Sequence, residues 1–293
     1  MGLYLDSRLE FLRASQNPDG GWGYFSGKGS WLEPTTYSML ALHGRSPEVW
    51  ERAWALVRSW QNPDGSFRPS GEVQDGTWVT ALGVTLARIR GNDDVRLRAS
   101  VDWLLRVVGA EHNIWTRTGS FLHLIKARLD VSHEGWPWRE GNATWIEPTA
   151  HTLIALKKVG GYRKAELEAR VRDGEALVLS RRCTDGGWNY GTPNMLYLDL
   201  PSYPETTALA LLGLNGHSER DYPDAVDVAE RFRSQTKTSL GRAWLQIALR
   251  CHGRRIAAPE ESAWTGHDVM LAALEALGHP DGNFRLFEAG GGV

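Results

Sequence analysis

Three glutamates occupy the same place in three versions of one segment. Glu33, Glu147 and Glu205 each follow an aromatic residue closely and precede an apolar run. A negative charge is stabilised at the start of a helix, so a structural role would explain each glutamate alone. If the helices surround one centre, the three carboxylates could ring one mouth and perform acid–base chemistry. The segments are SWLEPTTYSMLAL (30–42), TWIEPTAHTLIAL (144–156) and SYPETTALALLGL (202–214).

Glu147 has a second ionisable residue close to it in the sequence. His151 follows it by four residues, which places both side chains on one face of a helix. A histidine beside a carboxylate could shuttle a proton at neutral pH. A purely structural polar contact near the start of the helix is the alternative interpretation.

The elements that would position these residues are helices. Apolar residues recur at helical spacing, and no long segment alternates with period two, so we expect no major sheet. Segments that are apolar nearly all round are predicted to be inner, and amphipathic ones outer. The inner group comprises 30–42, 75–90, 118–130, 144–156, 202–214, 241–251 and 266–278, and the outer group 47–60, 163–182 and 221–235.

A short loop motif recurs between these helices. It reads QNPDGGW over 16–22, QNPDGSF over 61–67 and RCTDGGW over 182–188, with a degraded copy, HEGWPW, over 133–138. Asp-Gly favours a tight turn, the Gln amide can bond to backbone at neighbouring helix ends, and the large ring can cover a seam. About twelve helices in such repeats predict an all-α fold, a double-walled α/α toroid over 1–284, followed by a flexible tail.

The stretch FLRASQNPDGGW (11–22) resembles the QW repeat of squalene–hopene cyclases, oxidosqualene cyclases and the β subunits of protein prenyltransferases. The resemblance extends from Phe11 to about Gly282. It implies an α/α toroid with a central, aromatic-lined cavity for isoprenoid chains. A hydrophobic small molecule, an isoprenoid, is therefore the expected ligand.

Class II terpene cyclases protonate their substrate with the third residue of a D-x-D-D-T-A motif. The stretch WIEPTA (145–150) is similar at its end, and Glu147 falls at the position of the acid, while Trp145 and Pro148 replace the flanking aspartates. Glu33 and Glu205 occupy the same position in their segments. The resemblance implies that Glu147 is the proton donor, tuned by His151. Aromatic candidates for substrate binding are Trp31, Trp145, Tyr24, Tyr190, Tyr37 and Tyr203.

Protein prenyltransferases instead bind zinc through an Asp and a Cys in a D-G-C loop and a His that opens the last inner helix. Asp185 and His267 match two of these ligands, but Gly187 stands where the Cys is required. Cys183, two residues before Asp185, is a weak substitute. Because catalytic zinc needs three protein ligands, we expect neither a metal nor another cofactor.

Three hypotheses for function follow. The chain could be a class II-type cyclase, a non-catalytic binder of apolar ligands or scaffold, or a carbohydrate-active enzyme in which tryptophans stack on sugars. Triterpene cyclases contain two toroids and this chain has length for one, so a second subunit could complete the site. Peripheral contact with a membrane would suit an isoprenoid ligand.

Composition limits the remaining classes. The net charge of −2 gives no sign of nucleic-acid binding. No apolar run approaches the roughly 18 residues of a membrane span, and the first residues lack the apolar core of a signal peptide. With Cys183 and Cys251 as the only cysteines, we expect free thiols and a cytoplasmic protein. The 14 tryptophans are abnormal and indicate a repeated packing device or an aromatic cavity.

Overall fold

The computed structural model describes residues 2–112, 132–195 and 197–291. Within them are eleven α-helices and one short antiparallel pair, β1 (Asn194–Met195) and β2 (Leu198–Asp199). The helix expected over 118–130 lies outside the described residues. The helices are α1 (Leu3–Ala14), α2 (Leu32–Leu42), α3 (Pro47–Ser59), α4 (Thr80–Ile89), α5 (Val95–Arg106), α7 (Ile146–Lys157), α8 (Lys164–Ser180), α9 (Pro204–Leu214), α10 (Ala225–Gln235), α11 (Ser239–Cys251) and α12 (Val269–Leu277).

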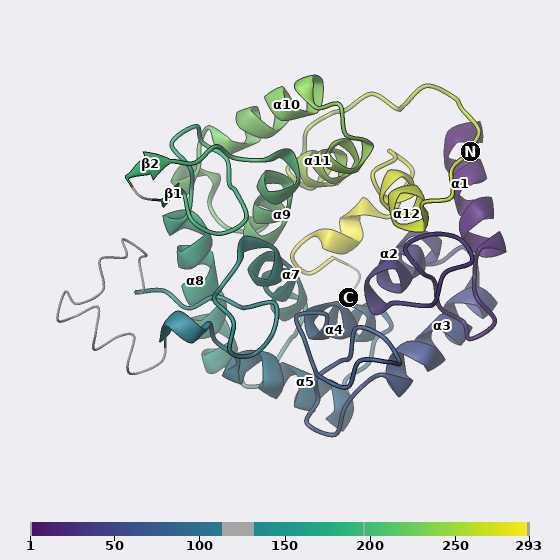
Figure 1. Ribbon diagram of the computed structural model, residues 1–293, viewed down its shortest axis with the longest axis horizontal. Coiled ribbons are helices and arrows are strands. Elements are labelled where there is room, and N and C mark those ends of the chain that lie inside the picture. Colours follow the sequence, from purple (N-terminus) through teal and green to yellow (C-terminus); the bar gives the residue numbers. More distant parts are fainter. Residues whose placement is uncertain (1, 113–131, 196, 292–293) are drawn as a thin grey trace.

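The helices form two concentric walls (Figure 1). In the inner wall α2, α4, α7, α9, α11 and α12 each pack against the next, and α12 returns to α2, which closes the ring. Helices α1, α3, α5, α8 and α10 lie outside it. In α2 and α9 nearly every residue after the first turn is buried, whereas the outer helices bury one face only. The predicted all-α, double-walled toroid is therefore confirmed.

The recurring loops join the walls through one repeated hydrogen bond. In four repeats a buried aromatic residue donates its backbone N–H to a threonine hydroxyl in the first turn of an inner helix. The pairs are Trp22–Thr35 (2.9 Å), Phe67–Thr80 (2.9 Å), Trp136–Thr149 (3.0 Å) and Trp188–Thr207 (3.0 Å). Each indole N–H also bonds to a carbonyl of an outer helix, at Leu12, Leu104 and Val178, so the buried ring is satisfied.

The glutamine amides of the loops reach the next outer helix, as the sequence predicts. Gln16 Nε2 donates to the carbonyl of Val49 at 2.9 Å, and Gln61 Nε2 donates to that of Arg96 at 2.8 Å. In the third loop Arg182 Nε bonds to the carbonyl of Gly186, as Gln16 does to that of Gly20. The glutamine contacts therefore fix the first two loops between two outer helices, whereas the arginine bond closes the third loop on itself.

A belt of backbone hydrogen bonds links successive repeats at the end of the ring where the inner helices begin. Each link joins the start of one inner helix to the loop before another. They run from Leu32 N to Pro69 O, Trp78 N to Trp138 O, Ile146 N to Tyr190 O and Val269 N to Tyr24 O, at 2.8–3.0 Å. The starts of these helices therefore lie at one end of the ring, which we call the N-terminal end.

Gly65 in the second loop tests this packing. It has φ +92°, and a Cβ there would lie 2.3 Å from the backbone carbonyl of Ala99 in α5. We expect Gly65→Ala to lower the free energy of unfolding by roughly 2–4 kcal/mol, because strained φ adds to a clash with backbone. The matched control, Gly27→Ala, also has positive φ but open space, and should cost about 1 kcal/mol. Urea denaturation of both variants measures the difference, and equal losses would contradict it.

The C-terminal segment differs from the expected flexible tail. The described part, 283–291, includes η3 (Phe284–Phe287) and lies inside the ring in Figure 1. Leu286 and Phe287 are buried, and the ammonium of Lys158 donates to the carbonyls of Glu288 and Gly291 at 2.8 and 2.7 Å. The apolar residues in this short stretch are the physical reason that it packs rather than extends into solvent.

Candidate functional site

The three glutamates share one register with a tryptophan that sequence analysis did not select. Glu33, Trp78, Glu147 and Glu205 each lie two residues before the threonine that joins the walls. They therefore stand at equivalent positions at the N-terminal end of α2, α4, α7 and α9. This shared register could have identified Trp78 as a site residue from the sequence. It was not selected because the α4 copy lacks the glutamate that marks the other three copies.

Glu33 and Glu147 interact electrostatically, and we call them the carboxyl pair. Burial raises the pKa of Glu147 to about 8, and the charge of Glu33 adds to this effect. Burial also raises the pKa of Glu33, although the hydroxyl of Tyr24, which donates to Glu33 Oε2 at 2.5 Å, opposes the rise. At neutral pH Glu147 therefore holds its proton, while Glu33 has a donor that favours its ionised form.

One turn further into the ring lies a cluster of four rings, which we call the aromatic base. Tyr37 and His151 follow the two glutamates by four residues, and the Tyr37 hydroxyl lies 3.2 Å from His151 Nε2. Trp78 and Trp244 complete the base, with centroids 5.2 and 6.1 Å from the histidine ring. Burial lowers the pKa of His151 to about 3, so the base carries no charge at neutral pH.

His151 has a hydrogen-bonding partner that sequence analysis did not identify. Its bonding partner is Tyr37 across the ring, and the pKa of Glu147 is raised by burial first and then by the charge of Glu33. Helical spacing put the histidine and Glu147 on one face but did not reveal the contact with the Tyr37 hydroxyl. Glu205 also differs from the pair: its Oε1 accepts a hydrogen bond from Thr238 at 3.1 Å and so links α9 to α11.

The six predicted aromatic residues separate into three places. Tyr24 contacts Trp31, with ring centroids 6.1 Å apart, beside Glu33. Tyr37 is fully buried in the aromatic base. Trp145, Tyr190 and Tyr203 are partly exposed and line a mostly apolar hollow of about 370 Å³ next to β1 and β2.

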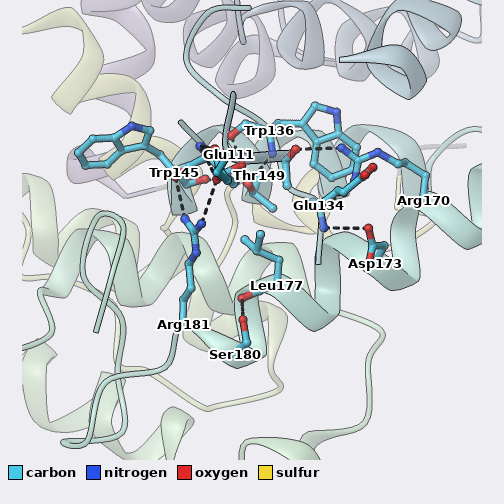
Figure 2. Close-up of polar contacts among 12 residues, drawn as sticks. Glu111, Glu134, Trp136, Trp145, Thr149, Arg170, Asp173, Leu177, Ser180 and Arg181 are labelled. Atoms are coloured by element: carbon cyan, nitrogen blue, oxygen red, sulfur yellow. Dashed lines mark hydrogen bonds and ion pairs between the residues drawn. The ribbon is translucent and has the colours of Figure 1, made fainter. Parts of the chain in front are cut away.

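A buried ion pair supports that hollow from below. Arg181 Nη2 lies 3.2 Å from Glu111 Oε1, and both side chains are less than a tenth exposed. Arg181 also donates to the carbonyl of Thr144 at 2.7 Å, while Glu111 accepts the N–H of Thr144. Figure 2 shows Arg181 reaching toward Glu111 beside Trp145. The pair therefore holds the backbone at Thr144, directly before α7. Trp145 and Glu147 follow Thr144 in the sequence.

The weak zinc candidates do not form a metal site. Asp185 accepts backbone N–H groups from Ser202 and Gly187, Cys183 is buried, and His267 is exposed. Across the described ranges, no group of three or more His, Cys, Asp or Glu side chains could hold a metal ion. Cys183 and Cys251 are both free thiols, as expected.

The fold and the site geometry define an α/α-toroid protein. No family model and no curated protein matches the sequence. The type II terpene cyclase MstE from Scytonema is similar in structure, with a TM-score of 0.54 and 18% identity over 94% of this chain and 77% of the cyclase. The endoglucanase Cel10 from Klebsiella pneumoniae, a family 8 glycosyl hydrolase, has a TM-score of 0.58 and 13% identity over 93% and 98% of the two chains.

A third solved structure, the endo-β-1,4-glucanase CMCax from Acetobacter xylinum, has a TM-score of 0.52 and 14% identity over 94% of this chain and 97% of the glucanase. At these identities the shared property is the toroid itself. Among the helices that the structure describes, none has the length and apolar character needed to cross a bilayer.

Proposed function

We propose that the chain is an enzyme that transfers a proton from Glu147 to an apolar, isoprenoid-type substrate, in the manner of a class II terpene cyclase. The observation that carries this proposal is the carboxyl pair above an uncharged aromatic base. Glu147 is protonated at the pH of the cell, and its position at the N-terminal end of α7 places it at the rim of the ring. A proton donor must be both loaded and within reach of its substrate.

Glu33 supports this role from the opposite helix. Once Glu147 gives up its proton, the site holds a carboxylate that a neighbouring anion would destabilise. The hydroxyl of Tyr24 takes up part of the charge on Glu33 by donating a hydrogen bond to it. The two acids thus differ in their surroundings, which is the arrangement that separates an acid from its partner in two-carboxyl sites.

The aromatic base suits a substrate that becomes positively charged. Ring faces attract cations, and tryptophan does so most strongly. A protonated imidazole in the base would repel such a charge, but burial keeps His151 neutral. The rings of the base can therefore stabilise a cation, and none of the four carries a positive charge that would repel it.

The test is a product assay with squalene, farnesyl diphosphate and geranylgeranyl diphosphate, analysed by gas chromatography–mass spectrometry. We expect wild-type protein to form a cyclised product and Glu147→Gln to reduce its rate at least about 100-fold, the usual contribution of a general acid. Glu48→Gln is the matched control, because Glu48 also lies in the first turn of a helix but is exposed on the outer wall. Folded protein that converts none of these substrates would favour an apolar-ligand binder or scaffold.

Carbohydrate hydrolysis is the second candidate, and the partly exposed rings of Trp145, Tyr190 and Tyr203 favour it. Such rings could stack on sugar faces beside a pair of carboxyl groups. A reducing-sugar assay with carboxymethyl cellulose and cello-oligosaccharides separates the two candidates. Release of sugar that disappears in Glu147→Gln or Glu33→Gln, with no conversion of isoprenoids, would replace the first proposal with this one.

A further inference from the structure

The C-terminal segment crosses the end of the ring opposite the glutamates and bonds to the last turns of four inner helices. It thereby ties together elements that are distant in the sequence. The contacts are Asn283 Nδ2 to the carbonyls of Leu40 and His43 at the end of α2, Cys251 Sγ of α11 to the carbonyl of Phe284, Lys158 Nζ after α7 to the carbonyls of Glu288 and Gly291, and Ala289 N to Asn215 Oδ1 after α9.

Phe287 is the residue of this segment that contacts the aromatic base. It is 3% exposed, and its ring meets Trp244 edge-on with centroids 6.0 Å apart. Trp244 in turn packs edge-on against Tyr37 at 5.3 Å and lies 6.1 Å from His151. A continuous series of rings therefore runs from the C-terminal segment to the residues one turn below the carboxyl pair.

Lys158 anchors the segment at a distance from these rings. Its side chain is buried, yet its ammonium is satisfied by two carbonyls of the segment, at 2.8 and 2.7 Å. A buried ammonium needs such acceptors, because leaving it unpaired is costly. The segment that carries Phe287 is thus held by a polar contact that lies outside the carboxyl pair and the aromatic base.

We propose that Phe287 is a positioning residue of the candidate site: it holds Trp244 against Tyr37 and His151 and keeps water from reaching the aromatic base through the C-terminal end of the ring. The proposal rests on the proposed function only in treating the residues above the base as an active site. The packing and the exclusion of water can be tested without any substrate.

The measurement is an NMR titration of the His151 imidazole, made in the wild-type protein and in single variants. Removal of the ring in Phe287→Ala should admit water beneath Trp244, and hydration of the imidazolium should raise the pKa of His151 by about one pH unit or more. Phe284→Ala is the matched control, because Phe284 lies in the same turn but packs against the guanidinium groups of Arg250 and Arg285. It should leave the titration of His151 unchanged.

Two further variants keep the test decisive if Phe287→Ala does not fold. Phe287→Leu retains most of the apolar volume and should produce a smaller rise. Lys158→Met removes the anchor and should raise the pKa of His151 in the same direction as Phe287→Ala. An unchanged titration in the folded variants, or an equal change in Phe284→Ala, would overturn the proposal. Neither result depends on whether the protein converts isoprenoids, so the proposed function would stand or fall separately.

Discussion

Replacing Glu147 with glutamine should stabilise the folded protein more strongly as the pH rises. The unfolded chain releases the proton of Glu147 near pH 4.5, whereas the folded chain holds it until about pH 8. Between these values the folded state binds more protons, so wild-type stability falls as the pH increases. Each pH unit costs about 1.4 kcal/mol, which amounts to roughly 3–5 kcal/mol across the window. Glutamine keeps the shape of the side chain and pays no ionisation cost.

Urea denaturation of wild-type protein and Glu147→Gln at pH 5, 6.5 and 8 measures this effect. The free-energy difference between them should grow steadily over that range. The double variant Glu33→Gln/Glu147→Gln should show the weakest pH dependence, because burial also raises the pKa of Glu33. Parallel stability curves for wild type and Glu147→Gln would mean that Glu147 is not held protonated, and the proton-donor role would lose its basis.

Arg170→Ala should lower the free energy of unfolding by about 3–4 kcal/mol. The guanidinium of Arg170 lies over the ring of Trp136, 3.7 Å from its centroid, and is buried with it. It donates to the carbonyls of Glu134, Gly135 and Val107 at 2.5–3.2 Å. Figure 2 shows Arg170 beside Trp136, with Asp173 of the same helix bonded to Glu134. Removing the side chain would leave buried carbonyls without donors and would also remove the cation–π contact.

Arg254→Ala is the matched control for that loss. Arg254 pairs with Asp227 at 3.6 Å and Glu230 at 3.2 Å, but all three side chains are substantially exposed. Exposed pairs of this kind contribute less than about 1 kcal/mol. Thermal and urea denaturation of the two variants should therefore differ clearly. Similar losses would show that the loop before α7 does not depend on the buried guanidinium.

The toroid could be predicted because each repeat carries local information. The Asp-Gly turns, the amide and the large ring fix the loop between two helices, and the apolar pattern separates inner from outer helices. The positive φ of Gly20, Gly65 and Gly186 and the contacts of Gln16 and Gln61 follow directly from residue type. These properties depend on neighbours that are close in the sequence or repeated along it.

Contacts across the ring could not be predicted in the same way. Helical periodicity contains no measure of the distance between Tyr37 and His151, which are 114 residues apart and belong to different helices. The prediction of a flexible tail was also wrong. The sequence of this short, glycine-rich segment does not show that one end of the ring is open, or that its few apolar residues can pack there. Trp78 and Trp244 were missed because their importance comes from where α4 and α11 stand around the centre.

The shared register of Glu33, Trp78, Glu147 and Glu205 separates the scaffold from its chemistry. The threonine two residues later holds the walls together in all four copies, while the register position itself is glutamate in three of them and tryptophan in the fourth. A single substitution at this position, such as Trp78→Glu, would add a carboxyl group at the rim and remove one ring of the aromatic base, while the seam bond between Phe67 and Thr80 would keep both of its partners. Repeats of this kind let evolution or design exchange one functional group at a time on a conserved frame.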